Sequence, residues 1–273
     1  MGLPAGELSN KTVLVTGGGR GIGRAIAHAF ARAGAAVAVT ARTPEQLAET
    51  VASAPRGPGR IVPLPADVTD KRAVEPMVGR VEREVGPVNV LINNAGSCGA
   101  IGPVSATNPD EWWRDVETNL LGTFLCVHAL LPRMLAAGSG TIINVASYAA
   151  VRPAPYSTAY GCAKAAVVHL TESLAAETRA SRVSVFAITP GTVQTDMTEY
   201  IIREAVEQEL PTPLVSGNWL SANRVADLAV FLASGKADRL TGRFIHVLDD
   251  VADLLRRVDM IERDDLYVVR LRK

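Results

Sequence analysis

Short apolar segments alternate with longer amphipathic ones along most of the chain. The short segments are rich in β-branched and apolar residues, which is typical of buried strands. We predict strands at residues 11–16, 36–40, 60–65, 88–92, 141–145, 183–188 and 243–247. Between them, apolar positions recur at helical spacing. We predict helices at residues 22–33, from near Pro44 onward, and at 70–85, 110–136 and 158–179.

This alternation predicts an α/β fold. Strands separated by helices form βαβ units, which give a parallel sheet covered by helices on both faces. Right-handed crossovers then favour a Rossmann-type, doubly wound parallel β-sheet. Because no linker or change of composition divides residues 1–273, we expect a single dinucleotide-binding and catalytic domain.

Composition narrows the partners and the compartment. The 273 residues are 48% hydrophobic and 21% charged with a formal net charge of zero, which argues against nucleic acid or an anionic membrane as a partner. The N-terminus lacks the pattern of a signal peptide, and no apolar stretch approaches the roughly 20 residues that span a bilayer. Cys98, Cys126 and Cys162 are isolated thiols without metal-ligand spacing, so we expect a cytoplasmic protein without a metal site.

Tyr160 and Lys164 are the strongest candidates for proton transfer. They are four residues apart in a predicted helix and therefore share one face, and Ser147 follows the predicted strand 141–145. A lysine cation favours phenolate, so we expect Lys164 to lower the tyrosine pKa. Serine can hydrogen-bond a substrate oxygen and tyrosine can exchange a proton with it. Taken alone, the Tyr–Lys pair could equally be an ordinary pair on a helix surface.

A glycine-rich turn, Thr16-Gly-Gly-Gly-Arg-Gly-Ile-Gly23, joins the first predicted strand to the first helix. Glycines let a backbone turn tightly and approach a pyrophosphate, whose charge is met by amides at a helix N-terminus. The glycine spacing differs from the usual dinucleotide fingerprint. A glycine turn without a ligand therefore remains an alternative at this point.

Together these motifs resemble the classical short-chain dehydrogenase/reductase family. The Thr-Gly-x-x-x-Gly-x-Gly turn, Asn-Asn-Ala-Gly at residues 93–96, and the Ser147, Tyr160 and Lys164 set all match its pattern. The matches run in order from about Lys11 to Val247 and so cover most of the chain. Further matching residues are Asp67, Val68, Asn119, Pro190, Gly191 and Thr195.

The resemblance implies a role for each catalytic candidate. Tyr160 would be the general acid in carbonyl reduction and the base in alcohol oxidation. Lys164 would lower the tyrosine pKa and hold the nicotinamide ribose, and Ser147 would orient the substrate oxygen. Asn119 would support a proton-relay water that reaches Lys164.

The expected cofactor site extends along the strand ends. Asp67 and Val68 would flank the adenine, and Pro190, Val193 and Thr195 would touch the nicotinamide end. The complete predicted set is Gly17, Arg20, Gly21, Ile22, Gly23, Arg42, Asp67, Val68, Asn94, Ala95, Gly96, Tyr160, Lys164, Pro190, Gly191, Val193 and Thr195.

Two arginines favour NADP(H) over NAD(H). No acidic residue ends the second predicted strand, where it would bind the ribose 2′-hydroxyl of NAD, and Arg42 is the first long side chain beyond it. Arg20 can approach the same 2′-phosphate from the glycine turn, so two guanidinium groups would converge on it. The alternative is a solvated Arg42 with Arg20 packed over the adenine of NAD.

The C-terminal end departs from the family pattern. Relatives commonly end in a strand followed by Asp-Gly-Gly, whereas here residues 10–248 form the family core and residues 249–273 form an extension. We predict a short amphipathic helix at 251–258 and an extended strand at 264–271, packed on its own domain or on a neighbouring subunit.

The predicted function is an NADP(H)-dependent short-chain oxidoreductase that interconverts a carbonyl compound, a ketone or aldehyde, and an alcohol. Substrate contacts are expected from residues 97–104, 151–156 and 192–219, the last as a lid whose apolar side chains suit a neutral or hydrophobic small molecule. A 3-oxoacyl-thioester reductase of a biosynthetic pathway and a nicotinamide-cofactor-sensing regulatory protein remain alternatives. Because relatives are usually dimers or tetramers, we expect a homo-oligomer.

Overall fold

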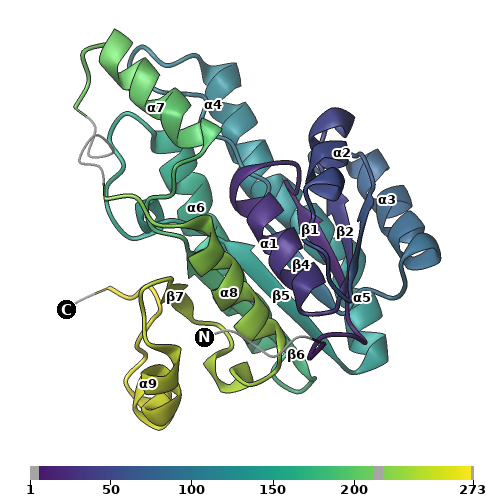
Figure 1. The fold of residues 1–273 in the computed structure, drawn as a ribbon. Coiled ribbons are helices and arrows are strands. Elements are labelled where there is room, and N and C mark those ends of the chain that lie inside the picture. Colours follow the sequence, from purple (N-terminus) through teal and green to yellow (C-terminus); the bar gives the residue numbers. More distant parts are fainter. Residues whose placement is uncertain (1–5, 212–217, 272–273) are drawn as a thin grey trace.

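A parallel sheet forms the centre of the computed structural model, which describes residues 6–211 and 218–271 (Figure 1). Its seven strands follow the order β3-β2-β1-β4-β5-β6-β7, and every neighbouring pair is parallel. The α/β, doubly wound prediction is therefore confirmed. The strands are β1 (Thr12–Thr16), β2 (Ala36–Thr40), β3 (Arg60–Pro63), β4 (Val90–Asn93), β5 (Gly140–Val145), β6 (Val183–Thr189) and β7 (Phe244–His246).

Helices cover both faces of the sheet. On one face α1 and α8 lie side by side over a core that includes Phe30 and Phe186; on the other, α3 and α5 pack over a core that includes Leu91 and Leu130. The helices are α1 (Gly21–Arg32), α2 (Pro44–Ala52), α3 (Lys71–Glu84), α4 (Pro109–Val116), α5 (Gly122–Ala137), α6 (Thr158–Glu177), α7 (Asp196–Glu207), α8 (Ala222–Ala233), α9 (Val251–Arg256) and α10 (Val258–Arg263).

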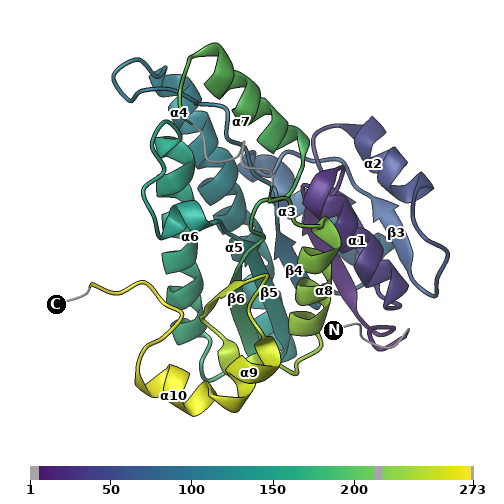
Figure 2. The ribbon, with the colours of Figure 1, turned by 60° about the vertical axis from the view of Figure 1, so that its left-hand side comes forward.

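The order of the strands reverses at β1, whose neighbours are β2 and β4. Such a switch point opens a crevice at the carboxyl ends of the strands, where ligands bind in doubly wound sheets. Helices α4 and α7 rise at one end of the molecule, whereas α9 and α10 lie at the opposite end (Figure 2).

The helix predicted at 110–136 is one continuous helix with an irregular middle. A π-helical turn, Glu117–Leu121, separates α4 from α5. By length and composition alone, the helix Pro109–Ala137 could cross a membrane, contrary to our count of apolar stretches. Its inward residues, such as Cys126 and Leu130, are nevertheless buried in the core over the sheet, as expected for a core helix.

The C-terminal extension packs on its own domain. Its helices α9 and α10 contribute Leu254 and Ile261 to the same core cluster as α1 and α8. The predicted strand at 264–271 is wrong, because Asp265 and Tyr267 adopt φ values of +50° and +61° and turn the backbone. The Tyr267 carbonyl instead accepts a hydrogen bond from the Phe244 amide at the end of the sheet. Part of the predicted lid, residues 212–217, lies outside the described residues.

Candidate active site

A cavity of about 250 Å³ opens at the carboxyl ends of the strands. It runs from the end of β2, past the glycine turn after β1 and the Asn-Asn-Ala-Gly segment after β4, to the start of α7. Its lining comprises Gly17, Gly19, Arg20, Gly21, Ile22, Gly23, Thr40, Ala41, Arg42, Thr43, Gln46, Ala66, Asp67, Val68, Asn94, Ala95, Gly96, Thr118, Val145, Ala146, Tyr160, Lys164, Pro190, Thr195, Asp196 and Met197.

The glycine turn lies against β4 too closely for side chains. A Cβ on Gly23 would lie 2.2 Å from the Gly17 carbonyl oxygen, and one on Gly17, whose φ is +63°, would lie 2.8 Å from the Ala95 Cα. Asn94 closes this contact by donating from Nδ2 to the Thr16 and Gly17 carbonyl oxygens at 3.0 and 3.2 Å. The turn is therefore held by close contacts within itself and with the segment that follows β4.

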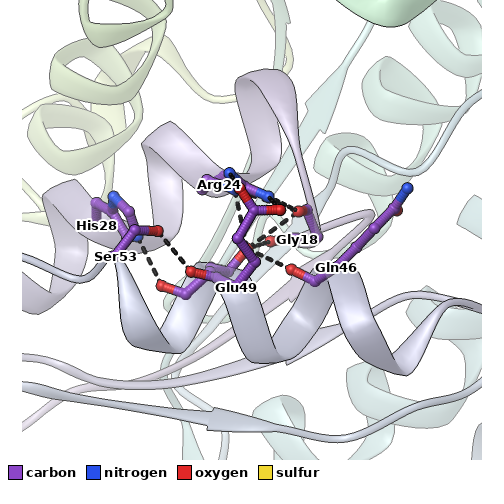
Figure 3. Close-up of polar contacts among 8 residues, drawn as sticks. Gly18, Arg24, His28, Gln46, Glu49 and Ser53 are labelled. Carbon is purple, nitrogen blue, oxygen red and sulfur yellow. Dashed lines mark hydrogen bonds and ion pairs between the residues drawn. The ribbon is translucent and has the colours of Figure 1, made fainter.

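Side chains behind the turn hold its carbonyl groups (Figure 3). Thr50, fully buried on α2, donates to the Gly18 carbonyl oxygen at 2.9 Å, and Arg24 on α1 donates to the Gly19 carbonyl oxygen at 2.6 Å. Arg24 also forms an ion pair with Glu49 at 2.8 Å. Since no side chain caps the N-terminus of α1 at Arg20, its first amides remain available for an anion.

The arginines differ from expectation in one respect. Arg20 and Arg42 both line the cavity, but Arg20 forms an ion pair with Asp196, the first residue of α7. The convergence of both guanidinium groups on one 2′-phosphate therefore stays a prediction, and it requires Arg20 to leave Asp196. In the described part of the chain, no ion pair involves Arg42, which is exposed.

Helix α6 presents Tyr160 and Lys164 to the inner end of the cavity. Lys164 is only 4% exposed and donates from Nζ to the Val145 carbonyl oxygen at 2.7 Å. Its Nζ lies 5.6 Å from the centre of the Tyr160 ring. The four-residue spacing therefore brings both side chains into one site beside the end of β5.

Burial dominates the pKa values of this pair. It lowers the pKa of Lys164 to about 8, and it raises the pKa of Tyr160 above its ordinary value. The neighbouring Cys98 raises the tyrosine pKa further, whereas the Ser147 side chain acts in the opposite direction. Our expectation of a lowered tyrosine pKa is therefore wrong for the protein alone, since desolvation of the phenolate is the largest influence on it.

Asn119 occupies the π-helical turn and is fully buried. Its Nδ2 donates to the Ser97 carbonyl oxygen at 2.7 Å and to the Asp115 carbonyl oxygen at 2.8 Å. Because both partners are acceptors, they fix the amide orientation and leave Oδ1 without a hydrogen-bond partner. A Cβ on Gly96 would lie 2.7 Å from this Oδ1 and 3.6 Å from Lys164 Nζ, so the free acceptor and the ammonium face the same small space.

The arrangement fits a dinucleotide. The backbone cradle around Gly17 and Gly23 admits a close ligand but no side chain, and the amides of α1 suit a pyrophosphate. The Oδ1 of Asn119 is an orphaned polar atom beside the lysine, which suits a bridging water. No group of three His, Cys, Asp or Glu side chains that could hold a metal occurs within residues 6–211 and 218–271.

Comparisons with known proteins agree with this geometry. A family model for short chain dehydrogenases matches residues 11–205. A short chain dehydrogenase of Pseudocercospora fijiensis is 35% identical over 284 residues, covering 97% of this chain and 91% of that protein. The chain belongs to the short-chain dehydrogenase/reductase family. It is an NAD(P)-dependent oxidoreductase acting on CH–OH groups.

Solved structures extend the short-chain dehydrogenase/reductase similarity to the whole fold. The structure of an NAD⁺-bound xylitol dehydrogenase has a TM-score of 0.81 and 27% identity, covering 88% of this chain and 98% of that one. A 3-oxoacyl-[acyl-carrier protein] reductase with bound NAD from Brucella melitensis has a TM-score of 0.76 and 32% identity, covering 89% and 91%.

Most residues that the short-chain dehydrogenase/reductase resemblance implies line the cavity, and four do not. Asn119 lies behind Gly96, and Ser147 stands beside the Tyr160 phenol and accepts from the Ala149 amide. Gly191 and Val193 lie outside the lining. The backbone of Val193 forms a β-bridge with Leu220, and the turn at Gly191 packs against the Leu220 side chain.

Several lining residues escaped the sequence reasoning. Thr118 could have been identified by its position next to Asn119. Thr43 and Gln46 could have been identified by their position after the second strand. Asp196 and Met197 lie in α7, where no motif marks them. Asp115 also escaped, although its spacing of four residues before Asn119 places both on one helix face.

Proposed function

We propose that this protein is an NADP(H)-dependent oxidoreductase that interconverts a neutral or hydrophobic ketone or aldehyde and its alcohol, with Tyr160 as general acid and base. One observation carries the proposal: Tyr160 and Lys164 line the same cavity as the glycine cradle, next to Ser147. Proton donor and cofactor cradle thus share one space.

The site residues divide the reaction between them. When bound, the nicotinamide supplies the hydride in reduction and accepts it in oxidation. In reduction, Tyr160 would donate its phenolic proton to the carbonyl oxygen of the substrate, and Ser147 would hold that oxygen by a hydrogen bond. The raised pKa of Tyr160 keeps the phenol protonated at neutral pH, which is the form that reduction requires.

Proton resupply would run through Lys164 and Asn119. Lys164, whose pKa is about 8, can release or accept a proton near neutral pH. The free Oδ1 of Asn119 can hold a water beside this ammonium. In the alcohol-oxidising direction the same groups would carry the proton away from Tyr160.

Arg42 supports the preference for NADP(H). It lines the cavity just beyond β2, where no carboxylate is available to bind a ribose 2′-hydroxyl. An exposed guanidinium at this position can bind a 2′-phosphate in a bidentate manner. Arg20 could join it once it leaves Asp196.

A biosynthetic 3-oxoacyl-thioester reductase is the second candidate. Its support is the similarity of this chain to the 3-oxoacyl-[acyl-carrier protein] reductase from Brucella melitensis. The same four residues, Asn119, Ser147, Tyr160 and Lys164, and the same glycine cradle would serve this substrate. No observation favours the regulatory alternative. A cofactor-sensing protein would not need the proton-transfer residues, whereas this chain has all four of them.

We also propose a cytoplasmic homo-oligomer. Leu121, Phe124 and Leu135 are 37%, 45% and 43% exposed along one helix at helical spacing. An exposed apolar stripe of this kind is typical of a contact with another protein. Size-exclusion chromatography with light scattering tests the oligomer: a monomer at micromolar concentration contradicts it.

The substrate and cofactor assignment is tested by following 340-nm absorbance with NADPH and NADH over ketones, aldehydes, quinones and 3-oxoacyl thioesters. We expect turnover with NADPH to exceed that with NADH and to favour uncharged carbonyl compounds. Preference for NADH would contradict the role of Arg42. A ranking led by 3-oxoacyl thioesters would favour the second candidate, and tight cofactor binding without any turnover would contradict the enzymatic proposal.

A further inference from the structure

Asp115 is a buried carboxylate next to the proposed proton-relay residue. It lies on α4, is only 3% exposed, and no ion pair involving it occurs in the described part of the chain. Burying a charge without a cation is costly unless several hydrogen bonds compensate for lost water. A buried apolar side chain would fill this helix position at lower cost, so the carboxylate requires a specific explanation.

The hydrogen bonds of the Asp115 carboxylate all go to the loop that follows β4. Its carboxylate accepts from the Ser97 hydroxyl at 2.6 Å, from the Gly99 amide at 2.8 and 3.0 Å, and from the Ala100 amide at 2.9 Å. Backbone amides and a hydroxyl thus replace the missing cation. The carboxylate thereby fixes the path of residues 97–100, which continue directly from the cofactor-lining Gly96.

Ser97 connects this carboxylate to Asn119. The Ser97 hydroxyl donates to Asp115, and the Ser97 carbonyl oxygen accepts from Asn119 Nδ2. The second Nδ2 hydrogen goes to the main-chain carbonyl of Asp115 itself. These three residues form a closed ring, and the ring determines which end of the Asn119 amide faces Lys164.

The same loop also contacts α7. Tyr200 on α7 donates from its hydroxyl to the Gly99 carbonyl oxygen at 3.1 Å. A second cavity of about 210 Å³ lies between α4, this loop and α7, and Asp115, Ser97, Gly99 and Tyr200 all line it. Residues 97–100 are therefore held by Asp115 of α4 on one side and by Tyr200 of α7 on the other.

We propose that Asp115 is a positioning residue of this enzyme: through Ser97 it orients Asn119 toward Lys164, and through Gly99 and Ala100 it fixes the loop beneath α7. The proposal rests on the relay role of Asn119 in the proposed function. Asp115 is not among the residues that line the proposed cofactor cavity, so we expect its loss to act on the chemical step more than on cofactor affinity.

The first test is steady-state kinetics of Asp115→Asn, with Asp110→Asn as the matched control. Asp110 lies on the same helix, is exposed, and takes the same change. We expect Asp115→Asn to lower kcat about tenfold while KM for NADPH changes less than threefold, and Asp110→Asn to match the wild type. Equal kcat in both variants would overturn the proposal.

A double-mutant cycle separates positioning from general damage to the fold. If Asp115 acts through Asn119, the double variant Asp115→Asn/Asn119→Ala has the kcat of Asn119→Ala alone. Multiplicative losses in the double variant would mean that Asp115 acts independently of Asn119, which overturns the proposal.

Hydrogen exchange gives a result that does not depend on turnover. In Asp115→Asn, and more strongly in Asp115→Ala, we expect faster exchange of the Gly99 and Ala100 amides, with unchanged exchange in β1 and an unchanged Kd for NADPH. Unchanged protection at both amides would overturn the loop-holding role. If the wild type turns nothing over, the proposed function fails, yet this exchange result still decides whether Asp115 holds the loop.

Discussion

The two ends of the active-site cavity are built in different ways. At the cofactor end, backbone meets backbone. A Cβ on Gly17 would clash with the Ala95 Cα, and one on Gly23 would clash with the Gly17 carbonyl oxygen. The Thr50 and Arg24 side chains hold the carbonyl groups of the turn. Where α7 borders this site, the contacts are instead made by side chains, such as Arg20 with Asp196 and Tyr200 with the Gly99 carbonyl oxygen.

This contrast indicates which substitutions each region tolerates and which properties they would change. A cradle made of backbone contacts accepts few substitutions, and in our proposal it binds the dinucleotide. A boundary made of exposed side chains can change residue by residue without disturbing the sheet. We therefore expect substitutions at the cofactor end to affect folding and cofactor binding, and substitutions at the α7 end to affect kinetics by smaller factors.

The largest effect should come from filling the cradle. Gly23→Ala would place a Cβ 2.2 Å from the Gly17 carbonyl oxygen, so backbone must move, and we expect a loss of about 3 kcal/mol or more in stability with NADPH binding abolished. Gly79→Ala is the control, because this α3 glycine meets only the end of the Arg83 side chain at 3.3 Å and should gain up to about 1 kcal/mol. Urea denaturation measures the stability of both variants. Equal effects of the two substitutions would contradict the claim that close backbone contacts exclude a side chain at Gly23.

A smaller effect is expected from the buried lysine. Burial lowers the pKa of Lys164 from 10.5 to about 8, so the folded protein loses its proton before the unfolded chain does. Between these pKa values the unfolded state binds more protons, and stability should rise with pH by up to about 1.4 kcal/mol per unit. Relative to Lys164→Met, the wild type should therefore gain stability from pH 8 to pH 10. A difference that does not change with pH would contradict the lysine pKa.

Arg42→Ala should change cofactor choice by an intermediate amount. Loss of a charge-assisted contact to the 2′-phosphate corresponds to about 1.5–3 kcal/mol, or about tenfold to a hundredfold in Kd for NADPH. The Kd for NADH should stay the same, because it lacks that phosphate. Fluorescence titration with both cofactors provides the measurement, and an equal loss for both would show that Arg42 does not read the phosphate.

The smallest effect is expected at the α7 boundary. Asp196→Asn removes the ion pair with Arg20. The side chains of Asp196 and Arg20 are 63% and 55% exposed. Exposed ion pairs contribute less than about 1 kcal/mol to stability. We expect stability to change by less than this and KM for NADPH to fall slightly, since Arg20 becomes free for the phosphate. A stability loss as large as that of Gly23→Ala would remove the contrast between the two ends.

The same contrast explains what the sequence could predict. The strand and helix order, the glycine turn and the Tyr160–Lys164 pair depend on local patterns, and the structure has the fold that they predict. The pKa of Tyr160 depends on burial by residues far along the chain, and Asp196 reaches Arg20 across 176 positions. The π-helical turn at Asn119 and the turns at Asp265 and Tyr267 also lack a local signature.

The most direct test of the account is single-turnover reduction by Tyr160→Phe with NADPH bound, on the best carbonyl substrate of the panel. The ring and its packing remain, and only the phenolic hydroxyl, with the proton that it donates, is lost. We predict an unchanged Kd for NADPH and a chemical step slower by about 10²–10⁴. A variant that reduces the substrate at the wild-type rate would contradict the role of Tyr160 as the proton donor.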